Sequence, residues 1–116
     1  AQPSETLLLR MADHPDIDNR GDYLRYISQW RGVFSTDRLL ILPYGDIRSD
    51  PIGFLRRVEE FIGAPPFDSY DLEGRVHETR KFLIPSSVTD RLRQRYAPQY
   101  AFLNSEFGAE FVARTR

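Results

Sequence analysis

FSTDRLLILPYGDIRSDPIGFLRRVEEFIG, residues 34–63, is the stretch from which the fold is predicted. Its apolar run 39–42 is too short for a helix and indicates a strand that is buried on both faces, as in a parallel sheet. Pro43 ends this run, because proline donates no hydrogen bond to a sheet. We therefore expect one parallel-type strand at the beginning of the stretch.

The second half of the stretch predicts an amphipathic helix with signals at both ends. Asp50 can accept hydrogen bonds from the first free amides, and Pro51 suits the first helical position. Gly63 can adopt the left-handed conformation that ends a helix. The apolar side chains between these ends recur at the helical spacing and form one stripe: Phe54, Leu55, Val58, Phe61 and Ile62.

Two helices are predicted before this unit. Ser4 can cap a short helix that runs to about Met11. A second helix begins at Asn19 or Gly21 and covers DYLRYISQWRGVF, residues 22–34. Its aromatic stripe could offer a stacking platform for bases. Core packing is the preferred interpretation, since the stripe has the spacing of one buried helix face.

After the unit, residues 64–86 form a long connection without clear periodicity, which is typical of functional or disordered segments. Ser86 or Ser87 then caps a helix that breaks or restarts at Pro98 and continues to Gly108. The expected inventory is one strand and four or five helices. Because one strand cannot make a sheet, the other strands must come from outside these residues, or the strand prediction is wrong.

The amino-acid composition limits the kinds of function that this chain can have. With 116 residues, of which 41% are hydrophobic, one folded domain is expected. The absence of cysteine excludes disulfides, thiolate metal sites and cysteine nucleophiles, and two distant histidines argue against zinc. A net charge of −1 creates no field to attract nucleic acid or an acidic membrane. With no signal peptide and no apolar run near the ~20 residues that span a bilayer, a cytoplasmic protein is the default expectation.

The order of the motifs resembles the C-terminal portion of sulfotransferases that use 3′-phosphoadenosine 5′-phosphosulfate. The resemblance begins with G-x-Y-x-x-x-I-x-x-W over residues 21–30, followed by the apolar run and the turn 44–47. A helix that opens with Asp-Pro and ends in Phe-Ile-Gly comes next. Further along lie a basic stretch, L-x-x-x-Y-x-P over residues 92–98, and Phe-Gly at 107–108. Gly45 departs from the family pattern, in which a glutamate is usual.

This resemblance implies an α/β, P-loop-like three-layer sulfotransferase fold, of which residues 1–116 would be the C-terminal part. The family's phosphosulfate-binding loop, of the type P-K-[ST]-G-[ST], is not found in these residues. The implied partner is the N-terminal half of the domain, on the same or a separate chain. The chain alone is therefore expected to be inactive. The intact enzyme would transfer a sulfuryl group to a hydroxyl or amine of a small molecule or glycan, without a metal.

The resemblance also implies a donor-binding segment at Thr79, Arg80 and Lys81, which would contact the 3′-phosphate. A guanidinium, an ammonium and backbone amides suit a dianionic phosphate. The alternative is a solvated basic loop that neutralises Glu73 and Glu78. No residue is assigned a catalytic role.

Other polar residues are given structural roles. His77 and His14 are expected to make local hydrogen bonds, although histidine can act as a general base near neutral pH. Asp46 is expected to brace the turn after the apolar run. Three arginines on the last helix are expected at a solvated surface, because their spacing does not place all three on one face: Arg91, Arg93 and Arg95. An alternative function for the whole chain is a small helical module that binds a partner protein.

Overall fold

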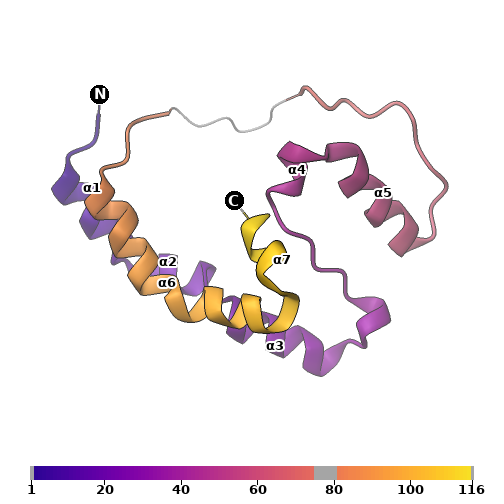
Figure 1. Cartoon of the computed structure of the whole chain (residues 1–116), viewed down its shortest axis with the longest axis horizontal. Helices are drawn as coiled ribbons and strands as arrows, with labels where there is room; N and C mark the ends of the chain where they lie inside the picture. Colours follow the sequence, from indigo (N-terminus) through magenta and orange to yellow (C-terminus); the bar gives the residue numbers. More distant parts are fainter. Residues whose placement is uncertain (1, 75–80, 116) are drawn as a thin grey trace.

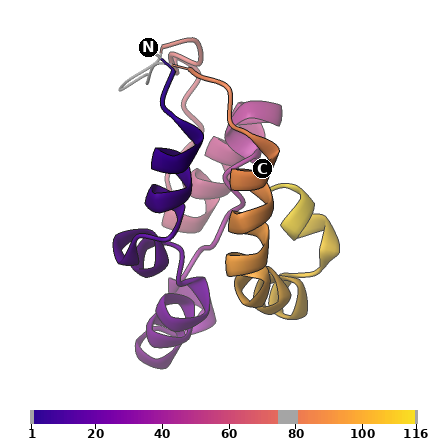
Figure 2. The ribbon, with the colours of Figure 1, turned by 90° about the vertical axis from the view of Figure 1, so that its left-hand side faces the viewer.

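The computed structural model describes residues 2–74 and 81–115, and every regular element in these ranges is helical. Helices α1, α2 and α3 follow one another along one side of the long helix α6, and α7 folds back beside the end of α6 (Figure 1). Figure 2 shows the same row of helices from its end. Helices α4 and α5 pack on each other. The elements are α1 (Glu5–Ala12), α2 (Pro15–Arg20), α3 (Tyr23–Val33), η1 (Thr36–Arg38), α4 (Asp46–Ser49), α5 (Pro51–Ile62), α6 (Ser86–Phe107) and α7 (Ala109–Ala113).

The predicted strand over residues 39–42 is wrong, and so is the α/β, three-layer fold class within the part of the chain that is described. Leu39 has extended torsion angles, φ −135° and ψ 110°. Within the described ranges, however, no backbone hydrogen bond joins residues 39–42 to another segment. The neighbours of this run lie on α3, α6 and α7, and helices already use their own backbone groups. An apolar run beside helices packs its side chains without becoming a strand.

Helix α5 confirms the sequence prediction at both ends. The N–H of Gly53 donates to the Asp50 carboxylate at 3.0 Å, and Pro51 occupies the first helical position. Gly63 ends the helix with φ 72° and ψ 22°, the left-handed region that favours glycine. The local signals of this helix agree with one another, so tertiary packing did not need to override them.

The first three helices were predicted in part. The Ser4 hydroxyl accepts from the Leu7 N–H at 3.2 Å, as expected for the cap of α1. A short helix, α2, begins at Pro15, between the two helices that had been predicted. Asp22, and not Asn19 or Gly21, caps α3 through the N–H of Arg25 at 3.3 Å.

The predicted break at Pro98 is wrong, because α6 runs without interruption from Ser86 to Phe107. Proline removes one helical hydrogen bond and crowds the preceding turn. Side chains on both sides of Pro98 are bonded to the α2–α3 region: Arg95 to Asp18, and Gln99 to the N–H of Leu24. We infer that these contacts hold the helix together across the missing bond.

The chain is more open than a compact domain of its size. Its radius of gyration is 17.1 Å, whereas about 13 Å is typical for this length. Its accessible surface is 9313 Å², whereas about 6,600 Å² is typical for this mass. The aromatic stripe of α3, predicted to lie in the core, is partly exposed, and Trp30 keeps 53% of its surface accessible. The buried apolar side chains of the described residues are few: Leu8, Ala12, Pro43, Val88 and Leu103.

Candidate functional site

The predicted donor-binding segment lies partly within the structure. Thr79 and Arg80 fall outside the described residues, as does His77, so their roles stay predictions. Lys81 is described and exposed, in the irregular stretch that leads into α6. Its ammonium can therefore be reached by a ligand.

The stretch after Lys81 is held at two points. The side-chain amide of Gln2 donates to the carbonyl of Leu83 at 2.5 Å and accepts from the N–H of Leu83 at 3.1 Å. The hydroxyl of Ser87, in the first turn of α6, donates to Glu5 at 2.6 Å. These contacts tie the entrance of α6 to the beginning of the chain.

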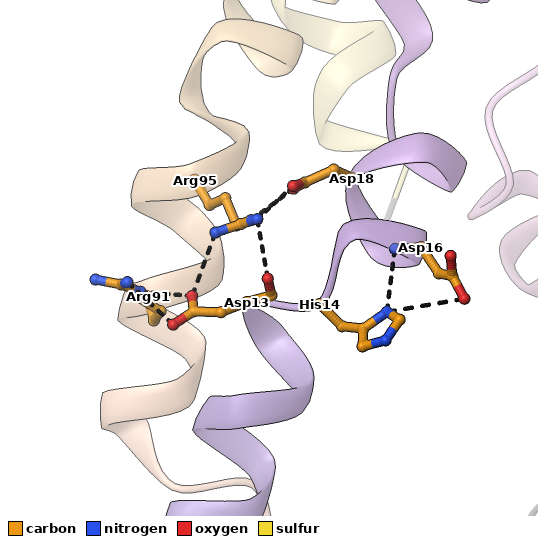
Figure 3. Close-up of polar contacts among 6 residues, drawn as sticks. All are labelled: Asp13, His14, Asp16, Asp18, Arg91 and Arg95. Atoms are coloured by element: carbon orange, nitrogen blue, oxygen red, sulfur yellow. Dashed lines mark hydrogen bonds and ion pairs between the residues drawn. The ribbon is translucent and has the colours of Figure 1, made fainter.

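Arg91 and Arg95 join α6 to the corner between α1 and α2 (Figure 3). Arg91 donates to both carboxylate oxygens of Asp13, at 2.8 and 3.0 Å. Arg95 donates through Nε to the Asp18 carboxylate at 2.5 Å and makes a second, shorter contact with the same carboxylate. It also donates to the carboxylate of Asp13 at 3.3 Å and to the main-chain carbonyl of Asp13 at 3.2 Å. These four residues form the cluster that we call the Asp–Arg quartet.

The quartet is fully ionised near neutral pH. The Arg91 guanidinium lowers the pKa of Asp13, and the Arg95 guanidinium lowers the pKa of Asp18. The same hydrogen bonds raise the pKa of both arginines. Since the charges balance, the quartet is suited to joining helices and not to attracting an anion. Arg91 and Arg93 lie at the exposed surface as expected, although Arg91 is paired, whereas the partial burial of Arg95 was not expected.

His14 has the local role expected for it. Its Nδ1 accepts from the N–H of Asp16 at 3.1 Å and so caps α2 (Figure 3). The Asp16 carboxylate lies 3.8 Å from the same nitrogen. The histidine thus satisfies a free amide at a helix start, a structural task that needs no substrate.

Glu59 is a buried carboxylate that the sequence did not single out. Its oxygens accept from Arg56 at 2.7 Å, from the N–H of Phe67 at 2.7 Å and from the hydroxyl of Tyr70 at 2.9 Å. The Arg56 hydrogen bond is the main cause that lowers the pKa of Glu59, and the Phe67 and Tyr70 bonds act in the same direction. Conversely, the bond to Glu59 raises the pKa of Tyr70. These contacts fold the beginning of the 64–74 connection onto α5.

Asp46 braces the turn after residues 39–42, as predicted. Its buried carboxylate accepts from Arg57 of α5 at 2.9 Å, and Arg114, just after α7, lies 3.7 Å away. The Arg57 contact fixes α4 against α5. The Arg114 contact brings the end of the described chain to the same turn.

Two of the pockets in the described structure lie beside α6. One, of about 310 Å³, lies where α2 and α3 meet α6, and its lining includes the rings of Tyr23, Tyr96 and Tyr100. The hydroxyl of Tyr96 is buried without a hydrogen-bond partner in the described structure, and desolvation is the main cause that raises its pKa. The other pocket, of about 290 Å³, lies between α3, α6, α7 and residues 41–44.

Residues 2–74 and 81–115 contain neither a metal-binding cluster nor a helix that could span a membrane. No group of three or more acidic or histidine side chains in these ranges is placed to hold a metal ion. None of the helices there combines the length and the apolar character that a membrane crossing requires.

Comparison with known proteins identifies the family. The sulfotransferase domain family matches residues 13–101, which is most of the chain. The chain belongs to the sulfotransferase domain family, as its motifs indicated. It is 38% identical over 50 residues to the bifunctional heparan sulfate N-deacetylase/N-sulfotransferase 4 of Mus musculus. This match covers 43% of the chain but 6% of that much longer protein. No solved structure matches the chain.

The sequence does contain a signal for the quartet. Arg91 and Arg95 are four residues apart and so share a helix face. Asp13 and Asp18 flank a proline turn, which indicates two acids at one corner. Glu59 gave no comparable signal, because its partners Phe67 and Tyr70 lie in a connection without periodicity.

Proposed function

We propose that this chain forms the C-terminal part of a sulfotransferase domain whose donor is 3′-phosphoadenosine 5′-phosphosulfate. The match to the sulfotransferase family over residues 13–101 carries the proposal. In the reaction, an oxygen or nitrogen of the acceptor attacks the sulfur atom. The bond from sulfur to the 5′-phosphate breaks, and 3′-phosphoadenosine 5′-phosphate leaves. The acceptor proton passes to a base outside these 116 residues.

In this proposal the segment Thr79–Lys81 contacts the 3′-phosphate of the donor. A cation at this point would pair with the charge of the 3′-phosphate and so hold the donor in place. The exposure of Lys81 supports the assignment, since the ammonium is accessible. The segment would bind and orient the donor, and the family chemistry assigns it no proton transfer.

We also propose that the phosphosulfate-binding part is supplied by a segment outside these residues. The open structure supports this, because its accessible surface exceeds the usual value for its mass by roughly 2,700 Å². Covering that surface would bury side chains such as Tyr44 and Val33, of which 72% and 76% is now exposed. A self-sufficient helical module, the alternative function, would bury more of them.

The acceptor is proposed to be a hydroxyl or amine, and a glycan amine is the first to test. This choice follows the relative of this chain that is named a heparan sulfate N-sulfotransferase. Activity on an N-deacetylated glycan, compared with a hydroxyl acceptor, distinguishes the two classes.

Calorimetry with 3′-phosphoadenosine 5′-phosphate tests the donor site. We expect little binding to the chain alone, and binding once the phosphosulfate-binding part is joined to it. In the joined protein, Lys81→Ala or Arg80→Ala should weaken binding about tenfold, the effect of one charge-assisted hydrogen bond. Arg93→Ala, which removes an exposed cation from α6, should leave the affinity unchanged. Equal affinity in all three variants would remove this segment from the site.

A further inference from the structure

A continuous line of polar contacts joins the first three helices to α6. The contacts pair Gln2 with Leu83, Glu5 with Ser87, Asp13 with Arg91 and Arg95, Asp18 with Arg95, Asp22 and Leu24 with Gln99, and Arg31 with Glu106. Every pair is separated by between 75 and 82 residues. The near-constant separation means that the two segments run in the same direction in one register, as Figure 1 shows. We call this line the polar seam.

The apolar core between these two segments is small, whereas the polar seam extends along their whole length. The apolar cluster between α1 and α6 consists of Leu8, Ala12 and Val88, with Leu9 and Leu92 packed against it. Along α2 and α3, no residue of either helix is buried. A slip of α6 by one residue, about 1.5 Å, would separate the paired groups of the seam without exposing much apolar surface.

Arg95 is the centre of the seam. It contacts Asp13, which ends α1, and Asp18 on α2, and uses three of its nitrogen atoms. A planar guanidinium with several partners fixes both distance and orientation, which a lysine ammonium does not. Each partly exposed pair adds little to stability by itself, but a slip of α6 would break several contacts of Arg95 at once.

Lys81 precedes Ser86, the first residue of α6, so the register of α6 affects where Lys81 lies. We propose that Arg95 is a positioning residue: it sets the register of α6 against α1 and α2, and thereby the place from which Lys81 reaches the donor. The second half of this inference depends on the proposed function. The first half depends on the geometry alone.

Distances between spin labels test the register. The chain has no cysteine, so cysteines introduced at the exposed positions Thr6 on α1 and Gln94 on α6 can be labelled selectively. We expect the same narrow distribution of distances in the parent and in Arg93→Ala. Arg95→Ala should shift the distance by about 1.5 Å or more, or broaden the distribution. A distribution that Arg95→Ala leaves unchanged would refute the register role.

Donor binding tests the link to Lys81 in the chain joined to its phosphosulfate-binding part. Arg95→Ala should weaken binding of 3′-phosphoadenosine 5′-phosphate about as much as Lys81→Ala does, and Arg95→Lys should weaken it less. The double variant should bind no more weakly than Lys81→Ala, because both changes remove the same contact, the one between Lys81 and the donor. A full additional loss in the double variant would show that Arg95 does not act through Lys81.

The register role and the donor role of Arg95 can be refuted independently of each other. If the joined parent protein does not bind the bisphosphate, the proposed function fails and the donor role of Arg95 fails with it. The spin-label distances still decide the register role in that case. The KM for the acceptor should be unchanged in Arg95→Ala. If this KM rises together with the loss of donor binding, the variant has a general structural defect and the positioning role is overturned.

Discussion

The hydroxyl of Tyr70 donates a hydrogen bond of 2.9 Å to the buried carboxylate of Glu59, eleven residues earlier on α5. Together with the N–H of Phe67, this contact brings the connection after α5 back onto the helix that it leaves. Arg56 donates to the same carboxylate and to the carbonyl of Phe67, so each group of this small network has a partner. The connection toward Lys81 thus begins from a fixed point.

Acid should weaken the fold through Glu59. Its pKa is lowered in the folded state, so its contribution to the free energy of unfolding is present above the ordinary carboxyl value of 4.5 and is lost as the pH falls through the lowered pKa. Glu59→Gln should be less stable near neutral pH and should lose less stability on acidification. Thermal unfolding from about pH 7 to about pH 3 measures both effects.

Glu60→Gln is the control for this prediction, because Glu60 is the exposed neighbour on the same helix. Its stability should follow the parent curve at every pH. If the stability of Glu59→Gln falls as steeply on acidification as that of the parent, Glu59 is excluded as a source of the pH dependence.

Two glycines should respond to alanine in opposite directions. Gly63 has a φ of 72°, so Gly63→Ala should lower the free energy of unfolding by about 1–2 kcal/mol. Gly32 lies within α3, and a Cβ added there meets nothing within 4 Å, so Gly32→Ala should raise it by about 0.5–1 kcal/mol. Chemical denaturation measures both changes. If both variants gain stability, the left-handed conformation of Gly63 is not what makes glycine favourable at the end of α5.

Removing the charge of Asp46 should loosen α4 from α5. Asp46→Asn cannot form the ion pair with Arg57 and leaves a buried group with poorer partners, which should cost about 1–3 kcal/mol. Asp68→Asn is the matched control, since Asp68 pairs with Arg56 but is largely exposed. Unfolding by urea compares them, and equal losses would argue against a special role for the buried turn.

The core near the C-terminal end of α6 should depend on Leu103. Leu103→Ala should cost about 2–5 kcal/mol, because Leu103 is buried and borders the pocket beside α3, which the truncation enlarges. Leu83→Ala removes a side chain that is 84% exposed and should change stability by less than about 0.5 kcal/mol. Melting curves of the two variants check the prediction, and a small loss in Leu103→Ala would mean that this end of α6 is weakly packed.

Sequence reasoning succeeded where the signals were local. The cap of α1 by Ser4, and the beginning and end of α5 at Asp50 and Gly63, all depend on residues within a few positions of one another. The family assignment also came from motifs in order, and the match over residues 13–101 confirms it. The donor role of Thr79, Arg80 and Lys81 stays a prediction.

Sequence reasoning failed where distant partners decide the outcome. The run 39–42 has the composition of a buried strand, but a strand exists only beside another strand, and none is present among the described residues. Pro98 should interrupt a helix on its own, yet α6 continues through it, with Arg95 and Gln99 bonded to the α2–α3 region on either side.

By itself, the sequence determined the ends of α1 and α5 and the family of the chain, because capping groups, glycine torsions and motif order are properties of neighbouring residues. Tertiary structure alone decided the register of α6 against the first three helices. It also decided the burial of Glu59 and the pairing of Arg95 with Asp13 and Asp18. The physical reason is that ion pairs between residues nearly eighty positions apart form only after the helices that carry them have been brought together.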